Sequence, residues 1–222
     1  GYVSDGSEIL LYLVFAPFAL IFVLGLYRRL HGLGIWSLIR QGPRGLIGAV
    51  RRLLVYAAVQ RRVARRPRGW PHLAIFYGFL TLLFGTTVVA IDWDIFRPFG
   101  VRLLVGTPYL YLEALLDLLG LAFVIGLLAA LIWRLLRLRR TGPDQRGMQW
   151  QFVGLIGALL YMGVTGFVLE GLRFTMDPVP WSGWSFAGAQ TAELLAAIGV
   201  GQFAPTIYTI LWWSHAVVAF SL

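Results

Sequence analysis

Apolar residues gather in five runs, separated by shorter stretches rich in arginine, glycine and proline. A helix rises about 1.5 Å per residue, so about 20 residues cross a hydrocarbon core of about 30 Å. The runs predict five membrane-spanning helices at about residues 9–27, 72–91, 110–133, 152–169 and 205–222. The fifth run is short and reaches Leu222 without a polar stop, so we expect this helix to continue beyond the chain. The predicted fold is an all-α integral membrane protein, a bundle of five transmembrane helices.

Charged residues are divided between the two ends of these helices. Sixteen arginines and one acidic residue fall on one side of the five-helix plan, and three arginines with nine acidic residues fall on the other. Because loops that remain in the cytoplasm carry the positive excess, the amino terminus is predicted to lie outside and the fifth helix to run inward. We expect a multi-pass protein of a bacterial or archaeal cytoplasmic membrane.

Two connections are expected to carry helices of their own. Between helices one and two, over residues 43–63, apolar residues recur at helical spacing with arginines between them. This pattern predicts an amphipathic helix on the inner leaflet. No aromatic residue or motif there favours nucleic acid, so no nucleic-acid partner is expected. In the outer connection, residues 171–204, a short helix is predicted over residues 187–198, where it would cover the outer end of the bundle.

The composition narrows the chemistry. Hydrophobic residues make up 59% of the 222 residues and charged ones 13%, so lipid is the expected solvent and the whole chain is one transmembrane domain. There is no cysteine, which excludes disulfides, thiolate zinc sites and iron–sulfur clusters held by this chain. Any metal would bind through histidine or carboxylate.

The three histidines differ in their predicted surroundings. His31 lies among arginines just after the first helix, where a headgroup-level residue without a special role is expected. His72 follows a proline at the start of helix two, so an interfacial role and a ligand role both remain open. His215 lies about ten residues into helix five, where a lone imidazole in hydrocarbon needs a partner. His215 is therefore predicted to be a metal ligand or a hydrogen-bonded proton carrier.

Histidines on two antiparallel helices suggest b haem, whose iron takes neutral imidazole ligands. Counted from the membrane boundaries, His215 lies about 15 Å below the outer one, whereas His72 lies at the inner one. Their levels are thus predicted to differ by about 10 to 15 Å. Axial ligands of one iron lie at nearly the same level, so His72 and His215 are expected to serve different haems.

Glycines and acidic residues mark two further features. Gly78 and Gly85 share one face of helix two, which favours close packing of a neighbouring helix over room for a porphyrin edge. On helix four, Phe167 is a candidate to line a flat ligand. Acidic residues gather at the outer helix ends, where they are either solvated or accept protons from a quinol; they are Asp92, Asp94, Glu113, Asp117 and Glu170. Glu170 is the candidate catalytic proton acceptor.

Two stretches carry a family resemblance. Helix two opens as WPHLAIFYGFLTLLFGT and helix five contains LWWSHAVVAFSL. With the five-helix plan, they resemble the membrane domain of the respiratory nitrate reductase gamma subunit family. The closer likeness is to the version fused to a cytoplasmic iron–sulfur module of the heterodisulfide reductase type, including electron-transfer-flavoprotein:menaquinone oxidoreductases.

The resemblance implies two b haems held by histidines of helices two and five. His72 would match the inner ligand of helix two, and His215 the outer ligand of helix five. The inner ligand of helix five would lie beyond Leu222. The outer ligand of helix two is absent, because a leucine, Leu82, occupies its expected place. This departure leaves the number of haems, one or two, open.

The leading functional hypothesis is a membrane electron-transfer subunit. It would pass electrons through b haem between the menaquinone pool and a cytoplasmic iron–sulfur protein or domain, with electron-transfer flavoprotein as a further partner. The iron–sulfur clusters would lie in that partner or in a module after Leu222. Two other classes remain open: a haem-free membrane anchor of a respiratory complex, and a transporter subunit, although the spans offer little central charge.

Overall fold

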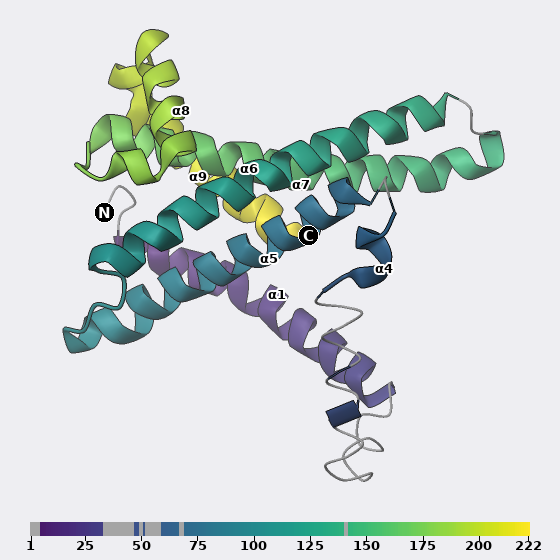
Figure 1. The fold of residues 1–222 in the computed structure, drawn as a ribbon. Coiled ribbons are helices and arrows are strands. Elements are labelled where there is room, and N and C mark those ends of the chain that lie inside the picture. The colour runs from purple at the N-terminus through teal and green to yellow at the C-terminus, as the bar shows by residue number, and fades with distance from the viewer. Residues whose placement is uncertain (1–4, 33–46, 49–50, 52–58, 67–68, 140–141) are drawn as a thin grey trace. The chain divides into compact units, whose positions relative to one another are not determined.

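The protein is helical throughout the described part of the chain. The computed structural model describes residues 5–32, 47–48, 51, 59–66, 69–139 and 142–222, and no strand occurs among them (Figure 1). Five helices are long and apolar enough to cross a membrane. These findings confirm the all-α fold class and fit a multi-pass membrane protein. The chain divides into two compact units, Gly1–Pro67 and Arg68–Leu222.

In the first unit, the described residues include one long helix and one short helix, and residues 47–48 and 51 are also helical. α1 (Asp5–Gly32) is apolar around its whole circumference, as a lipid-facing helix must be, and ends in Arg29 and His31. α4 (Arg61–Ala64) is a single turn. The amphipathic helix predicted over residues 43–63 falls largely on residues outside the described part, so it stays a prediction.

The described part of the second unit contains five α-helices, four long and one short, together with a π-helix that continues α5 (Ile91–Phe96) and three 3-10 helices (Arg97–Phe99, Ser182–Trp184 and Val200–Phe203). The α-helices are α5 (Trp70–Ala90), α6 (Gly106–Leu138), α7 (Pro143–Met176), α8 (Phe186–Ala197) and α9 (Ala204–Ser221). α6 and α7 extend far beyond the predicted spans, because polar residues at their ends continue the helix past the apolar run. The short outer helix predicted over residues 187–198 corresponds to α8. Proline begins α7 and stands near the start of α5 and α9, where its missing N–H is not needed.

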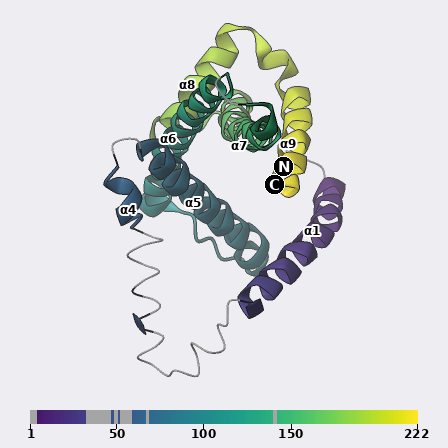
Figure 2. The ribbon, with the colours of Figure 1, turned by 90° about the vertical axis from the view of Figure 1, so that its right-hand side faces the viewer.

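The long helices of this unit pack in a row. α5 packs along α6, α6 along α7, and α7 along α9. Figure 2 shows α5 and α9 on opposite sides of the α6 and α7 pair. Because successive members of the row are antiparallel, α5 and α9 also run in opposite directions. α8 lies across the end of α7 and also contacts α6.

Glycines allow α5 to approach α6 closely. A Cβ built at Gly78 would lie 2.5 Å from the Cβ of Phe123 and 2.6 Å from the carbonyl oxygen of Leu119. At Gly85 a Cβ would overlap the side chain of Leu116. The two glycines thus serve helix packing, as the sequence favoured, and a flat ligand has no room at either position.

We expect Gly78→Ala to destabilise the protein by about 1–3 kcal/mol, because the new methyl group meets the backbone of α6. Gly157→Ala is the matched control, since a Cβ there meets nothing within 4 Å. This control should leave stability unchanged or raise it by up to about 1 kcal/mol through helix propensity. Thermal unfolding in detergent, followed by circular dichroism, measures both. Equal melting temperatures for the two variants would contradict the packing role of Gly78.

Candidate functional site

His215 lies in the middle of α9 and faces α7. Its Nδ1 atom is 2.7 Å from the hydroxyl oxygen of Thr165, and the side chain is half-buried. Its Cε1 atom lies 4.0 Å from a Cβ built at Gly166, so no side chain of that residue covers this edge of the ring. One ring nitrogen is therefore bound to α7, and the Nε2 atom has no hydrogen bond to the described residues. The sequence predicted that this imidazole needs a polar partner, and that partner is Thr165.

His72 lies at the start of α5 in a different setting. Its imidazole is exposed and stacks on Phe76, with ring centroids 6.4 Å apart and planes at 17°. Next to it, Trp70 meets Trp133 of α6 edge to face, with centroids 6.5 Å apart. Within the described residues neither ring nitrogen of His72 has a hydrogen bond. This exposed aromatic corner leaves His72 free to serve as a ligand or as an interfacial residue.

Contacts along α6 relate the levels of the two histidines. The carbonyl oxygen of Pro71, next to His72, would lie 2.9 Å from a Cβ built at Gly126. On α7, a Cβ built at Gly163 would lie 2.8 Å from Val124. His215 bonds to α7 two residues beyond Gly163, which corresponds to a level near residue 122 of α6.

By the same count His72 corresponds to about residue 125 of α6, so the two backbone positions differ by about three residues, or about 5 Å. The separation of 10 to 15 Å expected from the sequence was counted between membrane boundaries and stays a prediction. Helical side chains lean toward the amino terminus of their own helix. Since α5 and α9 run in opposite directions, the two imidazoles diverge from these backbone levels. No contact joins them, and their assignment to different haems stays a prediction.

Leu82 lies where the sequence suggested a second ligand of helix two. A Cβ built at Gly120 of α6 would lie 3.0 Å from the Phe167 ring and 3.6 Å from Leu82. The Phe167 ring therefore fills the space next to Gly120, between α6 and α7, and Leu82 packs beside it. This part of the row is closed by apolar side chains.

Acidic residues mark one end of the second unit, which we call the acidic end. Asp117 of α6 is 3% exposed, and one of its oxygens accepts a hydrogen bond from the Ala187 N–H at 2.5 Å. Ala187 lies in the first turn of α8, where N–H groups lack partners within the helix and a negative charge is favoured. Asp117 thus caps α8 from a neighbouring helix and fastens it to the row.

Glu170 of α7 lies at the same junction. Its carboxylate accepts a hydrogen bond from the buried Ser185 hydroxyl at 2.6 Å, and Arg173 lies 3.7 Å away. Ser185 lies 3.3 Å from Glu113, one helical turn from Asp117 on the same face of α6. Three carboxyl groups of α6 and α7 therefore meet under the start of α8.

Gly188 makes this junction possible. A Cβ built there would lie 2.6 Å from the carboxyl carbon of Glu170. The carboxyl group therefore reaches the backbone of α8 only because residue 188 has no side chain. The close approach explains why a small residue occupies the first turn of this helix.

Asp92 has a different role from the one the sequence suggested. It is 1% exposed, and it binds the Arg97 guanidinium at 2.9 Å and the backbone N–H groups of Leu103 and Leu104. Asp92 therefore holds the connection between α5 and α6 and does not join Glu170. Asp94 is exposed. The predicted group of acidic residues is thus divided in the structure.

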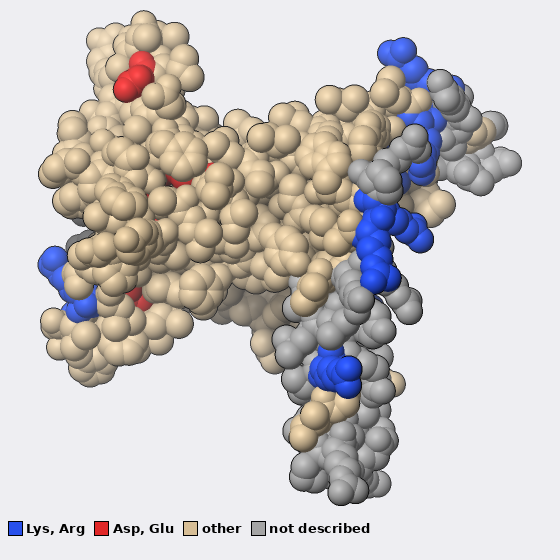
Figure 3. Space-filling view, in the orientation of Figure 1, with Lys and Arg blue, Asp and Glu red and all other residues tan. Residues whose placement is uncertain are grey.

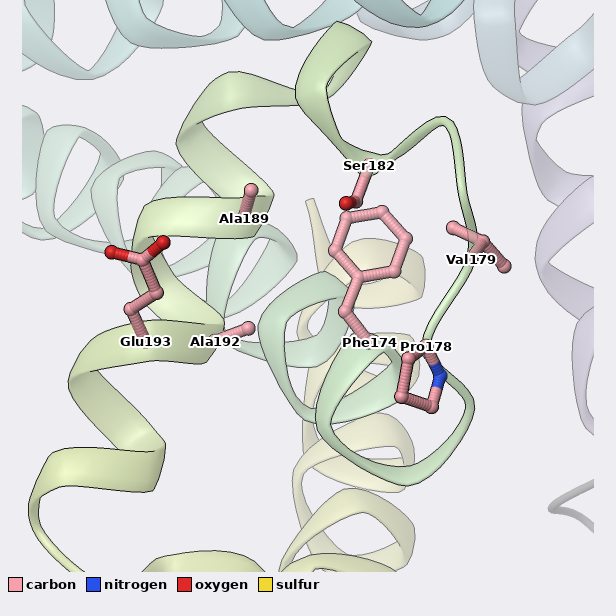
Figure 4. A pocket seen from close by; sticks show the side chains of 7 residues that line it. All are labelled: Phe174, Pro178, Val179, Ser182, Ala189, Ala192 and Glu193. Atoms are coloured by element: carbon pink, nitrogen blue, oxygen red, sulfur yellow. The ribbon is translucent and has the colours of Figure 1, made fainter.

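A pocket of about 170 Å³ lies between the end of α7 and α8. Figure 4 shows the Phe174 ring at its centre, with Pro178 on one side and Ala189 and Glu193 of α8 on the other. It is smaller than the 300–1,000 Å³ usual for small-molecule sites, and neither Glu170 nor His215 lines it. This pocket therefore does not define a binding site for a cofactor or substrate.

Arginines mark the opposite end of the second unit. Arg134 and Arg137 lie in the last turns of α6, and Arg134 bonds to Gln149 at 3.0 Å and stacks over Phe152. Figure 3 shows tan, uncharged surface along the middle of these helices, with red acidic groups and one blue cluster toward one end and further blue groups toward the other. This banding is what a membrane-spanning unit requires.

Among the described residues, no group of three or more histidine, aspartate and glutamate side chains could hold a metal ion. A metal ion at His215 or His72 would therefore need further ligands from a bound group, such as the nitrogen atoms of a porphyrin. Sequence reasoning missed Thr165 and Ser185, the two hydroxyl groups that bind His215 and Glu170. The signal for each was a lone hydroxyl residue in an apolar or buried stretch.

We expect Asp117→Ala to loosen α8, because the Ala187 N–H loses its acceptor at a cost of about 1–3 kcal/mol. Amide hydrogen exchange over residues 187–197, measured by mass spectrometry, should become faster. Asp94→Ala is the matched control, since Asp94 is exposed on the same end of the unit. If both variants exchange like the parent protein, Asp117 does not fasten α8.

Comparison with known proteins finds similarity to an oxidoreductase. The chain is 26% identical over 231 residues to EtfAB:quinone oxidoreductase of Syntrophomonas wolfei subsp. wolfei (strain DSM 2245B / Goettingen). The match covers 96% of this chain and 30% of that protein, so the chain spans less than a third of the relative's length. No protein-family model and no solved structure gives a significant match. The chain is thus similar to part of a quinone-linked oxidoreductase, and the likeness to the nitrate reductase gamma subunit stays a prediction.

Proposed function

We propose that this chain is the membrane part of a quinone-linked electron-transfer complex, and that it holds b haem through His215 and His72. The observation that carries the proposal is His215, an imidazole in the middle of a membrane-spanning helix with one nitrogen bound to Thr165 and the other without a hydrogen bond. An ionisable side chain at this depth in hydrocarbon is costly, and such residues usually have a function.

The residues around His215 fit an axial haem ligand. A ligating imidazole needs its Nε2 lone pair free and its other nitrogen bonded to an acceptor, and the Thr165 hydroxyl supplies that acceptor. Gly166 leaves the adjoining ring edge uncovered. When bound, b haem would accept and give up single electrons. The part of this chain is to hold the ring in place and to keep water away from it.

The partners follow from the relative's name. Similarity to EtfAB:quinone oxidoreductase supports a quinone, proposed to be menaquinone, as one reactant and electron-transfer flavoprotein as the other. This chain has no cysteine, so iron–sulfur clusters on the route would belong to a partner protein or domain. The complex would lie in a cytoplasmic membrane, with the arginine end of the helices facing the cytoplasm.

Replacement of the histidines tests haem binding. The purified protein should show b-type bands in a reduced-minus-oxidised absorption spectrum. His215→Ala should lose the haem that His215 holds, and His72→Ala should lose or alter another. His31→Ala is the matched control, because His31 is not a proposed haem ligand. Its ring contacts that of Tyr27 at the end of α1. A spectrum without b-type bands would favour a haem-free membrane anchor.

Glu170 is the proposed proton acceptor when quinol is oxidised. Quinol releases two protons with two electrons, so the site needs a base at the membrane surface. Glu170 lies at the acidic end beside Ser185 and Arg173, and its side chain is 19% exposed, which gives it contact with both the buried junction and the surface. Protons would leave through the acidic end while electrons pass to the haem.

Glu170→Gln should slow quinol-dependent haem reduction about 10²- to 10⁴-fold, the usual contribution of a general base. The amide oxygen can still accept from Ser185, so the absorption spectrum of the haem should not change. Glu193→Gln, an exposed acid on α8, is the matched control. Stopped-flow reduction by a menaquinol analogue measures both variants. Equal rates would remove Glu170 from the proposed site.

A further inference from the structure

Hydrogen bonds at two adjacent residues of α9, Ser214 and His215, join this helix to α7. The Tyr161 hydroxyl lies 2.6 Å from the Ser214 hydroxyl, and the Thr165 hydroxyl lies 2.7 Å from the Nδ1 atom of His215. Tyr161 and Thr165 are one helical turn apart, so they share a face of α7. Together the two bonds fix both the rotation and the level of α9 against α7.

The proton positions follow from a count of donors. The Thr165 oxygen lies 2.7 Å from the carbonyl oxygen of Tyr161 and 3.3 Å from that of Met162. A carbonyl can only accept, and a separation of 2.7 Å between two oxygens is that of a hydrogen bond with a proton between them. The single hydroxyl proton of Thr165 therefore goes to its own helix. The proton in the bond to His215 must then come from the ring.

The second bond follows the same rule. The Ser214 hydroxyl lies 2.9 Å from the carbonyl oxygen of Leu211, one turn earlier in α9, and donates to it. The Tyr161 hydroxyl therefore donates across the interface to Ser214. Each helix thus contributes one hydroxyl group that donates its proton to a carbonyl of its own helix. The oxygen of that hydroxyl accepts a hydrogen bond from the other helix.

We propose that Thr165 is a positioning residue, which holds His215 in the tautomer that has its proton on Nδ1 and its lone pair on Nε2. The Nδ1 to Cε1 edge lies along residues 165 and 166 of α7, where Gly166 has no side chain to contact Cε1, and Nε2 has no hydrogen bond to the described residues. A free Nε2 lone pair is what an iron ligand must offer. The part of this inference in which the Nε2 lone pair binds haem iron rests on the proposed function. The tautomer of His215 does not depend on that function.

The tautomer can be measured without reference to haem. In protein labelled with ¹⁵N-histidine, the ¹⁵N chemical shifts distinguish a protonated ring nitrogen from an unprotonated one, and His215→Gln assigns the signal. We expect protonated Nδ1 in the parent chain. Thr165→Ser keeps the hydroxyl and should keep this tautomer. Thr165→Val is nearly isosteric and lacks the acceptor, so it should give a mixture of both tautomers or the opposite one.

Haem affinity is the second readout. Loss of a residue that orients a metal ligand typically weakens binding about 10- to 100-fold. Thr165→Val should lose haem in this range during titration of the purified protein, whereas Thr165→Ser should not. Circular dichroism and gel filtration establish that both variants are folded.

The outcomes separate the inference from the proposed function. A proton on Nε2 in the parent chain, or an unchanged tautomer in Thr165→Val, overturns the positioning role even if haem is bound. If the parent chain binds no haem, the proposed function fails, and the ¹⁵N shifts still decide what Thr165 does. A tautomer that changes in Thr165→Val and is retained in Thr165→Ser supports the inference.

Discussion

The absence of water from the hydrocarbon core is the constraint on which this structure depends. A hydroxyl proton in the long helices needs an acceptor within the protein, and several serine and threonine residues donate theirs to a carbonyl three or four residues back in the same helix. Residues that do so are Thr87, Thr165, Thr175, Thr209, Ser214 and Ser221. Their oxygens retain lone pairs, and these lone pairs are the acceptors that α7 and α9 use to bind each other. The hydroxyl groups of Thr165 and Ser214, which donate within their own helices, thus also hold α7 and α9 together.

Much of the fold could be predicted from the sequence, because the length of an apolar run is a direct physical measure. Five runs of membrane length gave five spanning helices, and the small outer helix was placed within about one residue. The helix ends were missed, since polar residues such as those before residue 152 and after residue 169 continue α7 well past its apolar part. Close packing of a neighbouring helix at Gly78 and Gly85 was favoured from the sequence over room for a porphyrin edge, and the structure identifies that neighbour as α6.

The candidate site was harder to predict, because its contacts join residues far apart in the chain. The sequence showed that His215 needs a partner but not that Thr165, fifty positions earlier, is that partner. It also placed Asp92 with the other acidic residues, whereas this side chain holds the connection after α5. The degree of burial distinguishes a structural carboxylate such as Asp92 from a solvated one. Burial depends on which helices are neighbours, and the sequence does not show this.

The line of hydrogen bonds that starts at His215 ends at the Tyr161 carbonyl, a group that has no proton to pass on. A chain of groups conducts protons only if each member can both receive and release one. The route from His215 through Thr165 is therefore closed to protons, although it is polar. If His215 holds haem as proposed, electron transfer there would not be accompanied by proton movement along this route.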